Sequence, residues 1–197
     1  MPIKAVIFDL NGTVIQSPKF SDLFCEKFGT SKEVFLPALK ETMAKIRLPS
    51  AGSAYIYWKP YLDKWGIKLS EKDFFNFWFS SEKENTEITE LAKNLKRQGI
   101  KLFILSNNFA ERTKYYDENF LFLKELFDKV YYSWQTGFVK PDPRAWQNLL
   151  TENNLKPEEC IYFDNEEEKV KVASGLNIKA FIFKDAKNTK EIIDSVI

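Results

Sequence analysis

The sequence contains no histidine among its 197 residues. This absence excludes catalysis by a Ser-His-Asp or Cys-His arrangement, and it excludes a zinc site built on imidazole ligands. Any proton transfer that this chain catalyses must therefore use a carboxyl, amino, phenol or thiol group.

Cysteine is also scarce, with Cys25 and Cys160 as the two thiols. Two cysteines are too few for a disulfide framework, so we expect a reducing, cytoplasmic environment. The sequence begins in an expected strand without a leader segment, and no apolar run approaches the roughly 20 residues of a membrane span. Because the net charge is only +1, we expect neither nucleic acid nor a membrane as a partner.

Five short apolar runs have the character of buried strands. They occupy residues 3–8, 101–105, 129–133, 160–163 and 179–183. Residues 88–99, 142–154 and 166–175 lie between them and have helical spacing; Asp142 is the expected N-cap of the second, with Pro143 at its first helical position. Strands that alternate with helices predict an α/β fold with a doubly wound, Rossmann-like parallel sheet.

Residues 17–81 interrupt this alternation, since they contain no convincing strand. They predict four helices, over 21–28, 31–46, 55–65 and 71–79, and ten aromatic residues crowd the second half of the segment. We interpret residues 17–81 as a helical insertion whose aromatics form its own core. The sheet domain then comprises residues 1–16 and 82–197.

Polar side chains follow several of the expected strands. These are Asp9 and Asn11 after the first strand, Ser106, Asn107 and Asn108 after the second, Lys140 downstream of the third, and Asp164 and Asn165 after the fourth. Ligands bind beyond the carboxyl ends of the strands in an open parallel sheet. We therefore expect these groups to converge at one edge.

This set of groups suits phosphoryl transfer. An aspartate such as Asp9 can attack phosphorus and form an aspartyl-phosphate, and Asp9 with Asp164 can supply the carboxylates that Mg²⁺ prefers. Ser106 and the neighbouring amides can hold phosphoryl oxygens, and Lys140 can neutralise negative charge. Gly12 allows the backbone to turn sharply and approach a phosphate closely.

The motifs FDLNGT, FILSNN, GFVKPDP and IYFDN occur in this order, each at an expected strand end or in the loop that follows. Their order and positions resemble the four motifs of the haloacid dehalogenase-like (HAD) hydrolase superfamily. The resemblance covers residues 1–16 and about 82–197, and residues 17–81 fall where the first subclass carries its helical cap. The region around GFVKPDP looks like the branch that holds small-molecule phosphatases and haloacid dehalogenases.

The resemblance implies a role for each matching position. Asp9 is the nucleophile and a metal ligand, the backbone carbonyl of Asn11 is a second metal ligand, and Asp164 completes a Mg²⁺ site directly or through water. Thr13 supports the loop.

On the same grounds, the transferring phosphoryl group is bound by Ser106, by the backbone near Asn107 and at Gly12. Lys140 stabilises the intermediate.

Two positions depart from the family pattern. Phosphatases of the family have aspartate where this chain has Asn11, and an amide cannot act as general acid and base, which is typically worth about 10²–10⁴-fold in rate. Asn165 replaces a second aspartate and lowers the negative charge around the metal. Glu168, one helical turn after Asp164, either compensates by holding a metal-bound water or only favours the start of a helix.

Three functions remain open. The first is a Mg²⁺-dependent phosphatase of a small phosphorylated metabolite, weakened by Asn11. The second is a non-catalytic relative that binds a phosphate or metabolite. The third is a metal-independent haloacid dehalogenase, against which Asp164 and the FDLNGT loop argue.

Overall fold

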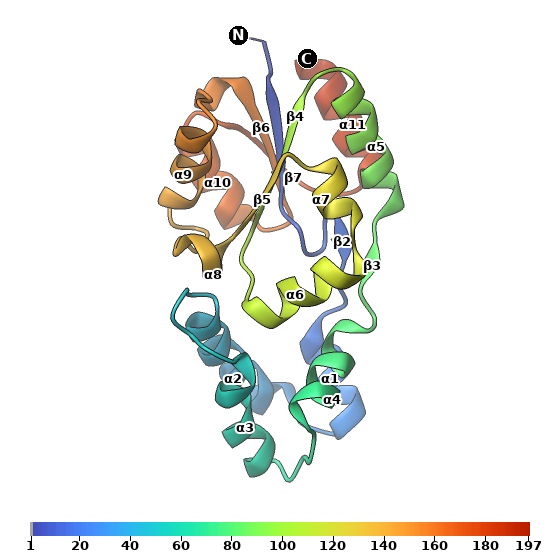
Figure 1. Cartoon of the computed structure of the whole chain (residues 1–197), viewed down its shortest axis with the longest axis vertical. Coiled ribbons are helices and arrows are strands. Elements are labelled where there is room, and N and C mark those ends of the chain that lie inside the picture. Colours follow the sequence, from blue (N-terminus) through green and yellow to red (C-terminus); the bar gives the residue numbers. More distant parts are fainter. Residues whose placement is uncertain (1) are drawn as a thin grey trace.

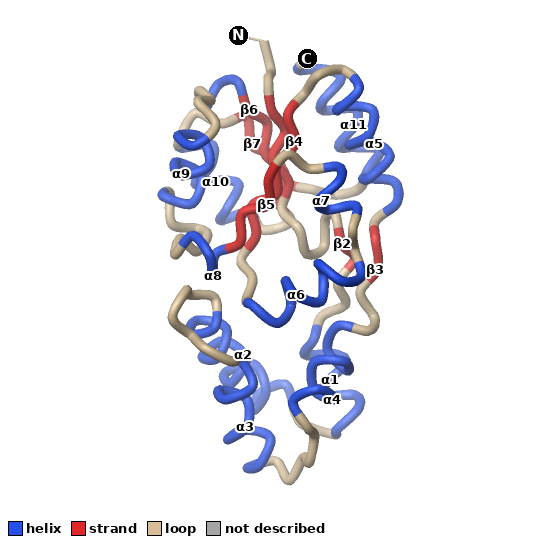
Figure 2. Tube along the Cα trace, viewed as in Figure 1, coloured by secondary structure: helices blue, strands red, loops and turns tan. Residues whose placement is uncertain are grey.

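A computed structural model describes residues 2–197, and its centre is a five-stranded sheet (Figures 1 and 2). The strands are β1 (Ala5–Phe8), β4 (Lys101–Ser106), β5 (Lys129–Tyr132), β6 (Cys160–Asp164) and β7 (Lys179–Ile182). All neighbours pair in parallel, in the order β5-β4-β1-β6-β7. The predicted doubly wound α/β fold is therefore confirmed.

Helices cover both faces of this sheet (Figure 1). They are α5 (Thr86–Arg97), α6 (Ala110–Asn119), α7 (Phe122–Leu126), α8 (Ser133–Thr136), α9 (Arg144–Glu152), α10 (Glu167–Gly175) and α11 (Ala186–Val196), with a short 3-10 helix at Pro157–Glu159. Helices α5, α7 and α11 lie on one face, and α9 and α10 lie on the other.

The sequence of β1 explains why both faces are apolar. Successive side chains of a strand point to opposite faces. Val6 and Phe8 join the apolar cluster on the α5 side, whereas Ala5 and Ile7 join the cluster on the α9 side. A strand that is buried on both faces reads as an unbroken apolar run rather than an alternating one.

The strand order places the candidate site. The chain passes from β1 to β4 and β5 on one side, then returns to β6 and β7 on the other side of β1. Ligands of open α/β sheets bind at such a switch point, outside the carboxyl ends of the strands. β1, β4 and β6 are adjacent at this point, so the residues that follow them meet there.

Four further helices form a separate layer of packing, drawn in the lower half of Figure 1. They are α1 (Phe20–Phe28), α2 (Lys32–Ile46), α3 (Ala54–Lys64) and α4 (Glu71–Phe79). Each of the four helices expected in the insertion is found to within one residue at either end. Their shared core is aromatic, with Phe24, Phe35 and Trp58 fully buried among other rings.

The two chain segments that connect these helices to the sheet lie side by side. Strands β2 (Ile15–Gln16) and β3 (Lys83–Glu84) pair antiparallel and form a two-stranded ribbon. Sequence patterns did not predict this ribbon, because two residues per strand carry no periodicity.

Helix α9 also differs from the expectation at its start. It begins at Arg144, and Pro143 rather than Asp142 is its N-cap residue. Asp142 nevertheless accepts a hydrogen bond from the backbone N–H of Arg144 at 2.9 Å, so it still satisfies a free donor of the first turn.

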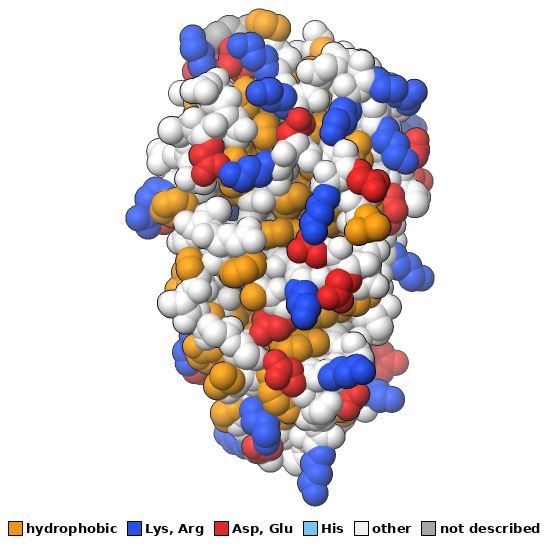
Figure 3. Space-filling model, in the orientation of Figure 1, with side chains coloured by type: hydrophobic (Ala, Val, Ile, Leu, Met, Phe, Trp, Pro, Cys, Tyr) orange, Lys and Arg blue, Asp and Glu red, His pale blue; other side chains and the backbone are white. Residues whose placement is uncertain are grey.

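The surface is mixed in charge. Lys and Arg side chains alternate with Asp and Glu on the face drawn in Figure 3, over both the sheet domain and the helical layer. Within residues 2–197, the helices are all too short or too polar to span a bilayer.

Candidate active site

The loop after β1 brings Asp9 to the edge of the sheet. The backbone N–H of Asp9 donates to the carbonyl of Phe163 at 2.8 Å, so the residue stays in register with β6 just past the end of its own strand. Asp164 is the last residue of β6 and is fully buried. The two carboxyl groups expected to converge are thus on adjacent strands.

Lys140 joins these two carboxylates. Its Nζ atom lies 2.7 Å from Oδ1 of Asp9, 2.7 Å from Oδ2 of Asp164 and 3.0 Å from the hydroxyl of Tyr162. The Lys140 side chain is only 1% exposed. An ammonium group has three N–H donors, and these three contacts supply an acceptor for each of them.

The pKa values of the three groups reflect burial and mutual charge. Burial raises the pKa of Asp9, and Lys140 offsets part of this effect. Burial also disfavours ionised Asp164, but Lys140 and Lys169 outweigh it and lower the pKa of Asp164. Burial opposes the charge on Lys140, but the two carboxylates raise the pKa of Lys140 above its usual value. Lys140 therefore stays charged at neutral pH.

Asn107 fixes the backbone of Lys140. Its side-chain Nδ2 donates to the carbonyl of Lys140 at 2.7 Å, and its Oδ1 accepts from the Lys140 N–H at 2.8 Å. The amide after β4 therefore positions the lysine, a function that its place in the sequence does not reveal.

Ser106 is the last residue of β4 and is 2% exposed. It does not cap the next helix, because α6 begins only at Ala110 and has Phe109 as its N-cap residue. The neighbouring Asn108 is held instead by Ser133, whose hydroxyl accepts from the Asn108 N–H and donates to its carbonyl, both at 3.1 Å.

The turn after Asp9 requires a glycine at position 12. Gly12 has φ +84°, and a Cβ atom there would overlap with Nδ2 of Asn165. Thr13 is fully buried, and its hydroxyl has no hydrogen-bond partner among residues 2–197. The side chain of Asn85 does support the loop, because its Nδ2 donates to the Thr13 carbonyl at 2.8 Å.

Both the nitrogen and the oxygen of the Asn11 side-chain amide are hydrogen-bonded. Its Nδ2 donates to the hydroxyl of Tyr116 at 2.6 Å and to that of Ser17 at 2.9 Å, and its Oδ1 accepts from Asn108 at 3.2 Å. Hydroxyl groups can donate as well as accept. A carboxylate at position 11 could therefore keep all three partners.

Asn165 is the second position that departs from the family pattern, and it contacts the loop after β1. Its side-chain Nδ2 donates to the backbone carbonyl of Asn11 at 3.1 Å. Lys169 is buried and pairs with Glu166, and its Nζ lies 3.9 Å from Oδ1 of Asp164. Glu168 is exposed in the first turn of α10, where the helix dipole stabilises its negative charge.

The chemistry of the donor set fits Mg²⁺. Residues 2–197 hold no cluster of three or more His, Cys, Asp or Glu side chains arranged as a metal site. Mg²⁺ does not require one, because it is usually bound by one or two carboxylates, waters and the substrate phosphate. Asp9, Asp164 and the Asn11 carbonyl supply two carboxylates and one neutral oxygen.

The sequence patterns did not identify five residues that contact the site at this edge. They are Tyr162, Tyr116, Ser17, Ser133 and Lys169. One usable signal existed for Tyr162, because residues two apart on a strand share a face, so it lies on the same side of β6 as Asp164. Tyr116 and Ser17 come from other elements, and no local pattern points to their contact with Asn11.

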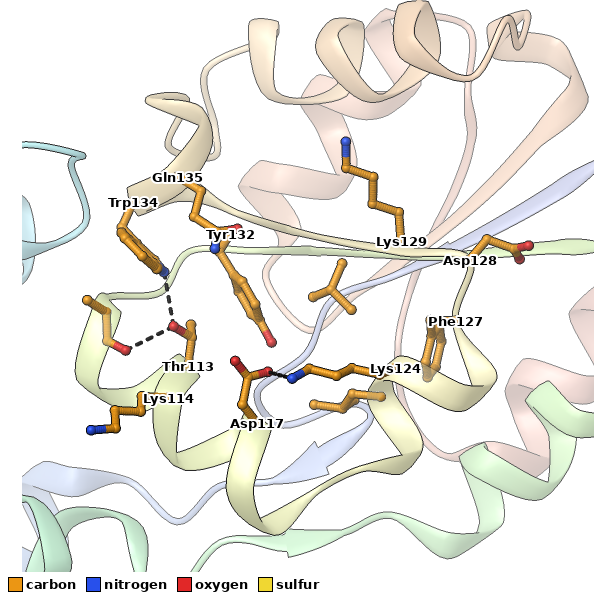
Figure 4. Close-up of a pocket in the computed structure, with 13 residues that line it drawn as sticks. Thr113, Lys114, Asp117, Lys124, Phe127, Asp128, Lys129, Tyr132, Trp134 and Gln135 are labelled. Carbon is orange, nitrogen blue, oxygen red and sulfur yellow. Dashed lines mark hydrogen bonds and ion pairs between the residues drawn. The ribbon is translucent and has the colours of Figure 1, made fainter.

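A separate hollow of about 660 Å³ lies beside the edge strand β5, lined by residues of α6, α7 and α8 (Figure 4). Trp134 donates there to Thr113 at 3.1 Å, and Lys124 pairs with Asp117 at 2.9 Å. None of the strand-end carboxylates lines it, so this hollow is not the candidate site.

Comparison with known proteins identifies the family of this chain and supports its fold. A family model described as haloacid dehalogenase-like hydrolase matches residues 3–175. The mouse protein "Acyl-CoA dehydrogenase family member 10" is 28% identical over 89% of this chain, and the pig "Bifunctional epoxide hydrolase 2" is 23% identical over all of it. The chain spans only 17% and 39% of the lengths of these two relatives.

Among solved structures, the HAD family enzyme bt-2542 from Bacteroides thetaiotaomicron aligns with a TM-score of 0.84 at 21% identity, over 98% of this chain and 99% of that one. The same enzyme in complex with magnesium and inorganic phosphate gives 0.76 at 22% identity, over 93% and 95%. The L-2-haloacid dehalogenase RSc1362 gives 0.74 at 13% identity, over 98% and 100%. These likenesses establish a shared fold.

Proposed function

This chain belongs to the haloacid dehalogenase-like hydrolase family, and we propose that it is a Mg²⁺-dependent phosphatase of a small phosphorylated metabolite. One observation carries the proposal. Asp9 is placed at the switch point of the sheet and is linked through Lys140 to Asp164, at 2.7 Å on each side. A buried carboxylate held in this way is suited to act as a nucleophile.

In the proposed reaction an Asp9 carboxylate oxygen forms a bond to phosphorus while the ester O–P bond breaks. The leaving oxygen departs as an alkoxide or phenolate and takes a proton from solvent water, and the phosphoryl group remains on Asp9 as an acyl phosphate. Water then attacks phosphorus, and inorganic phosphate leaves while the Asp9 carboxylate is restored. Lys140 keeps its charge throughout and stabilises the negative oxygens that develop beside it.

The oxygens that would hold Mg²⁺ are those of Asp9, Asp164 and the Asn11 carbonyl. When bound, the ion supplies positive charge that neutralises the phosphoryl oxygens. Ser106 and the backbone at Gly12 and Asn107 are the proposed contacts for those oxygens, since they lie at the end of β4, which neighbours β1, and in the turn that follows Asp9.

We further propose residues 17–81 as a cap over this site, with residues 1–16 and 82–197 as the hydrolase core. The antiparallel ribbon of β2 and β3 contains both connections between these parts. A lid that closes over an active site excludes water and helps to define the substrate. Location in the cytoplasm stays a prediction.

Asn11 limits this proposed activity. Its amide cannot donate a proton to the departing alkoxide and cannot take one from water. We therefore expect slow turnover of alkyl phosphates, which need leaving-group protonation, and faster turnover of aryl phosphates, which need it much less.

A catalytically impaired, phosphate-binding relative is the second candidate. Asn11 and Asn165 favour it, because together they remove a proton shuttle and one negative charge from the region of the metal. A haloacid dehalogenase is the third candidate, and the carboxylate of Asp164 beside Asp9 disfavours it.

The test is hydrolysis of p-nitrophenyl phosphate and of glycerol phosphate in Mg²⁺ by the protein, by Asn11→Asp and by Asp9→Asn. Asn11→Asp should raise kcat on glycerol phosphate by about 10²–10⁴-fold, with a much smaller gain on p-nitrophenyl phosphate. Asp9→Asn should abolish both reactions.

Asn94→Asp on the exposed face of α5 is the matched control, because it makes the same chemical change away from the site. If wild type and Asn11→Asp are both inactive on both esters while binding phosphate, the non-catalytic relative is the better description. Activity that survives in Asp9→Asn would disprove the proposed nucleophile.

A further inference from the structure

Lys169 is a buried cation of the sheet domain to which the proposed reaction gives no role. It lies on the inward face of α10, one helical turn before Ala173, which is buried as well. Lysine is almost never fully buried unless it is paired, because its ammonium group loses its water. Lys169 is 7% exposed, so its partners must offset the cost of burial.

Two carboxylates surround the ammonium of Lys169. Its Nζ atom pairs with Glu166 and lies 3.9 Å from Oδ1 of Asp164. Glu166 is exposed, whereas Asp164 is fully buried. Burial pushes the pKa of Asp9 and that of Asp164 upwards, and the charges of Lys140 and Lys169 act to lower both. Lys169 therefore acts on both carboxylates that are proposed to hold Mg²⁺.

The oxygens of Asp164 are almost fully engaged before any metal ion binds. Oδ2 accepts from Nζ of Lys140 at 2.7 Å and from the hydroxyl of Tyr162, and Oδ1 accepts from the backbone N–H of Glu166 at 2.9 Å. An ionised carboxylate offers about four acceptor sites. The fourth therefore lies on Oδ1, which is the oxygen that Lys169 approaches.

The charges that are joined by ion pairs at this edge already balance. The pairs run from Asp9 through Lys140, Asp164 and Lys169 to Glu166. Apart from the exposed Glu166, this series contains two carboxylates and two ammonium groups, all buried. Mg²⁺ alone would add two uncompensated positive charges to a buried site, whereas a phosphate dianion that binds with it restores neutrality.

We propose that Lys169 competes with Mg²⁺ for Asp164, so that the free site binds Mg²⁺ weakly and takes up the ion together with a phosphate group. The proposal rests on the proposed phosphatase function for the metal ligands and for the phosphate. Lys169 then regulates metal loading and is not a catalytic residue. A phosphate ester favours loading of the site, and the departure of inorganic phosphate favours release of the ion.

The test measures Mg²⁺ binding by titration calorimetry, with and without inorganic phosphate, and therefore requires no turnover. Lys169→Met removes the ammonium and keeps the length of the side chain, and Lys169→Arg keeps the charge. Lys171→Met is the matched control, because it removes the same charge from an exposed position of the same helix.

Lys169→Met should bind Mg²⁺ alone about tenfold or more tightly than wild type, because a unit charge no longer opposes the ion at Oδ1 of Asp164. A merely structural role would give the opposite sign, since a damaged site loses affinity. Lys169→Arg and Lys171→Met should stay within about twofold of wild type. In wild type, inorganic phosphate should raise the affinity for Mg²⁺ by about tenfold or more.

Glu166→Gln is a second test at an exposed side chain, where the fold has little to lose. It removes the partner that holds the Lys169 ammonium away from Asp164, so Mg²⁺ should bind about threefold or more weakly. Glu167→Gln makes the same change at the next residue, which is also exposed. It should alter the affinity by less than about twofold, because solvent and salt screen an exposed charge.

The proposal is overturned if wild type binds Mg²⁺ equally tightly with and without phosphate, or binds it in neither condition. It is also overturned if Lys169→Met gains no more affinity than Lys171→Met, or if Glu166→Gln loses no more than Glu167→Gln. Hydrolysis of p-nitrophenyl phosphate judges the proposed function separately. A wild type that is inactive but gives the expected binding results would retain the role of Lys169 and reject the phosphatase.

Discussion

Removal of Lys140 is the sharpest test of how the site is held together. Lys140→Met keeps the length of the side chain but leaves Asp9 and Asp164 without their shared cation. Breaking a buried pair by removing one partner typically costs about 3–5 kcal/mol, because an uncompensated charge stays buried. Lys169 offers little replacement, because its Nζ lies 3.9 Å from Asp164 and already pairs with Glu166.

Lys4→Met is a matched control. Lys4 pairs with Glu159 at 2.7 Å, the distance that separates Lys140 from Asp9, but its side chain is 56% exposed against 1% for Lys140. Exposed pairs contribute about 1 kcal/mol or less. The same charge is removed at the same distance, so the difference between the two variants reports burial together with the second carboxylate, Asp164, that Lys4 does not have.

The assay is urea unfolding with a chelator present, so that no divalent cation replaces the ammonium. We expect Lys140→Met to lower the free energy of unfolding by about 3–5 kcal/mol at neutral pH and Lys4→Met by less than about 1 kcal/mol. Asp9→Asn in the Lys140→Met background should recover part of the loss, since it removes one of the stranded charges.

The pH dependence has a defined sign. Lys140 lowers the pKa of Asp164, so this part of the stability is present above the ordinary aspartate pKa and is lost as the pH falls below it. The gap between wild type and Lys140→Met should therefore shrink as the pH falls below about 4. A loss in Lys140→Met no greater than that in Lys4→Met would refute the reasoning.

Three shorter predictions follow from buried groups. Gly12→Ala should lower the free energy of unfolding by about 1–2 kcal/mol in urea titrations, because alanine is strained at φ +84°. It should also weaken phosphate binding by displacing Asn165. If neither the stability nor the affinity changes, the left-handed turn at Gly12 is wrong. Thr13→Val should leave stability unchanged or raise it in the same assay, since the lost hydroxyl has no partner within residues 2–197, whereas a loss would reveal one. Burial raises the pKa of Cys160 from 9.0 to about 12. The thiol therefore ionises first in the unfolded chain, and the free energy of unfolding should fall by about 1.4 kcal/mol per pH unit above pH 9. Cys160→Ala should make that slope shallower, and an equal slope in both proteins would contradict the pKa shift.

The sheet and its edge could be predicted because strands buried on both faces leave unbroken apolar runs. Polar residues after those runs were expected to meet at one edge, and Nζ of Lys140 indeed lies 2.7 Å from both Asp9 and Asp164. The four helices of the insertion were equally predictable, since apolar residues recur at helical spacing, and Gly29, Pro49 and Gly66 lie just beyond the ends of the first three.

Contacts between distant elements could not be predicted in the same way. Tyr116 contacts Asn11 across 105 positions of sequence, and nothing in its polar helix, AERTKYYDEN, distinguishes it from the neighbouring Tyr115.

Position 11 joins these two kinds of information. The sequence shows an amide where a proton shuttle is expected, and the structure shows that its neighbours, Tyr116, Ser17 and Asn108, can all donate to a carboxylate as well. As they stand, two of these partners accept from the amide nitrogen of Asn11 and one donates to its oxygen, so the surroundings suit an amide and could turn to suit a carboxylate. The Asp9–Lys140–Asp164 bridge does not depend on position 11. The Asn11→Asp rate therefore tests the proton transfer alone, whereas the stability of Lys140→Met tests how the carboxylates are held.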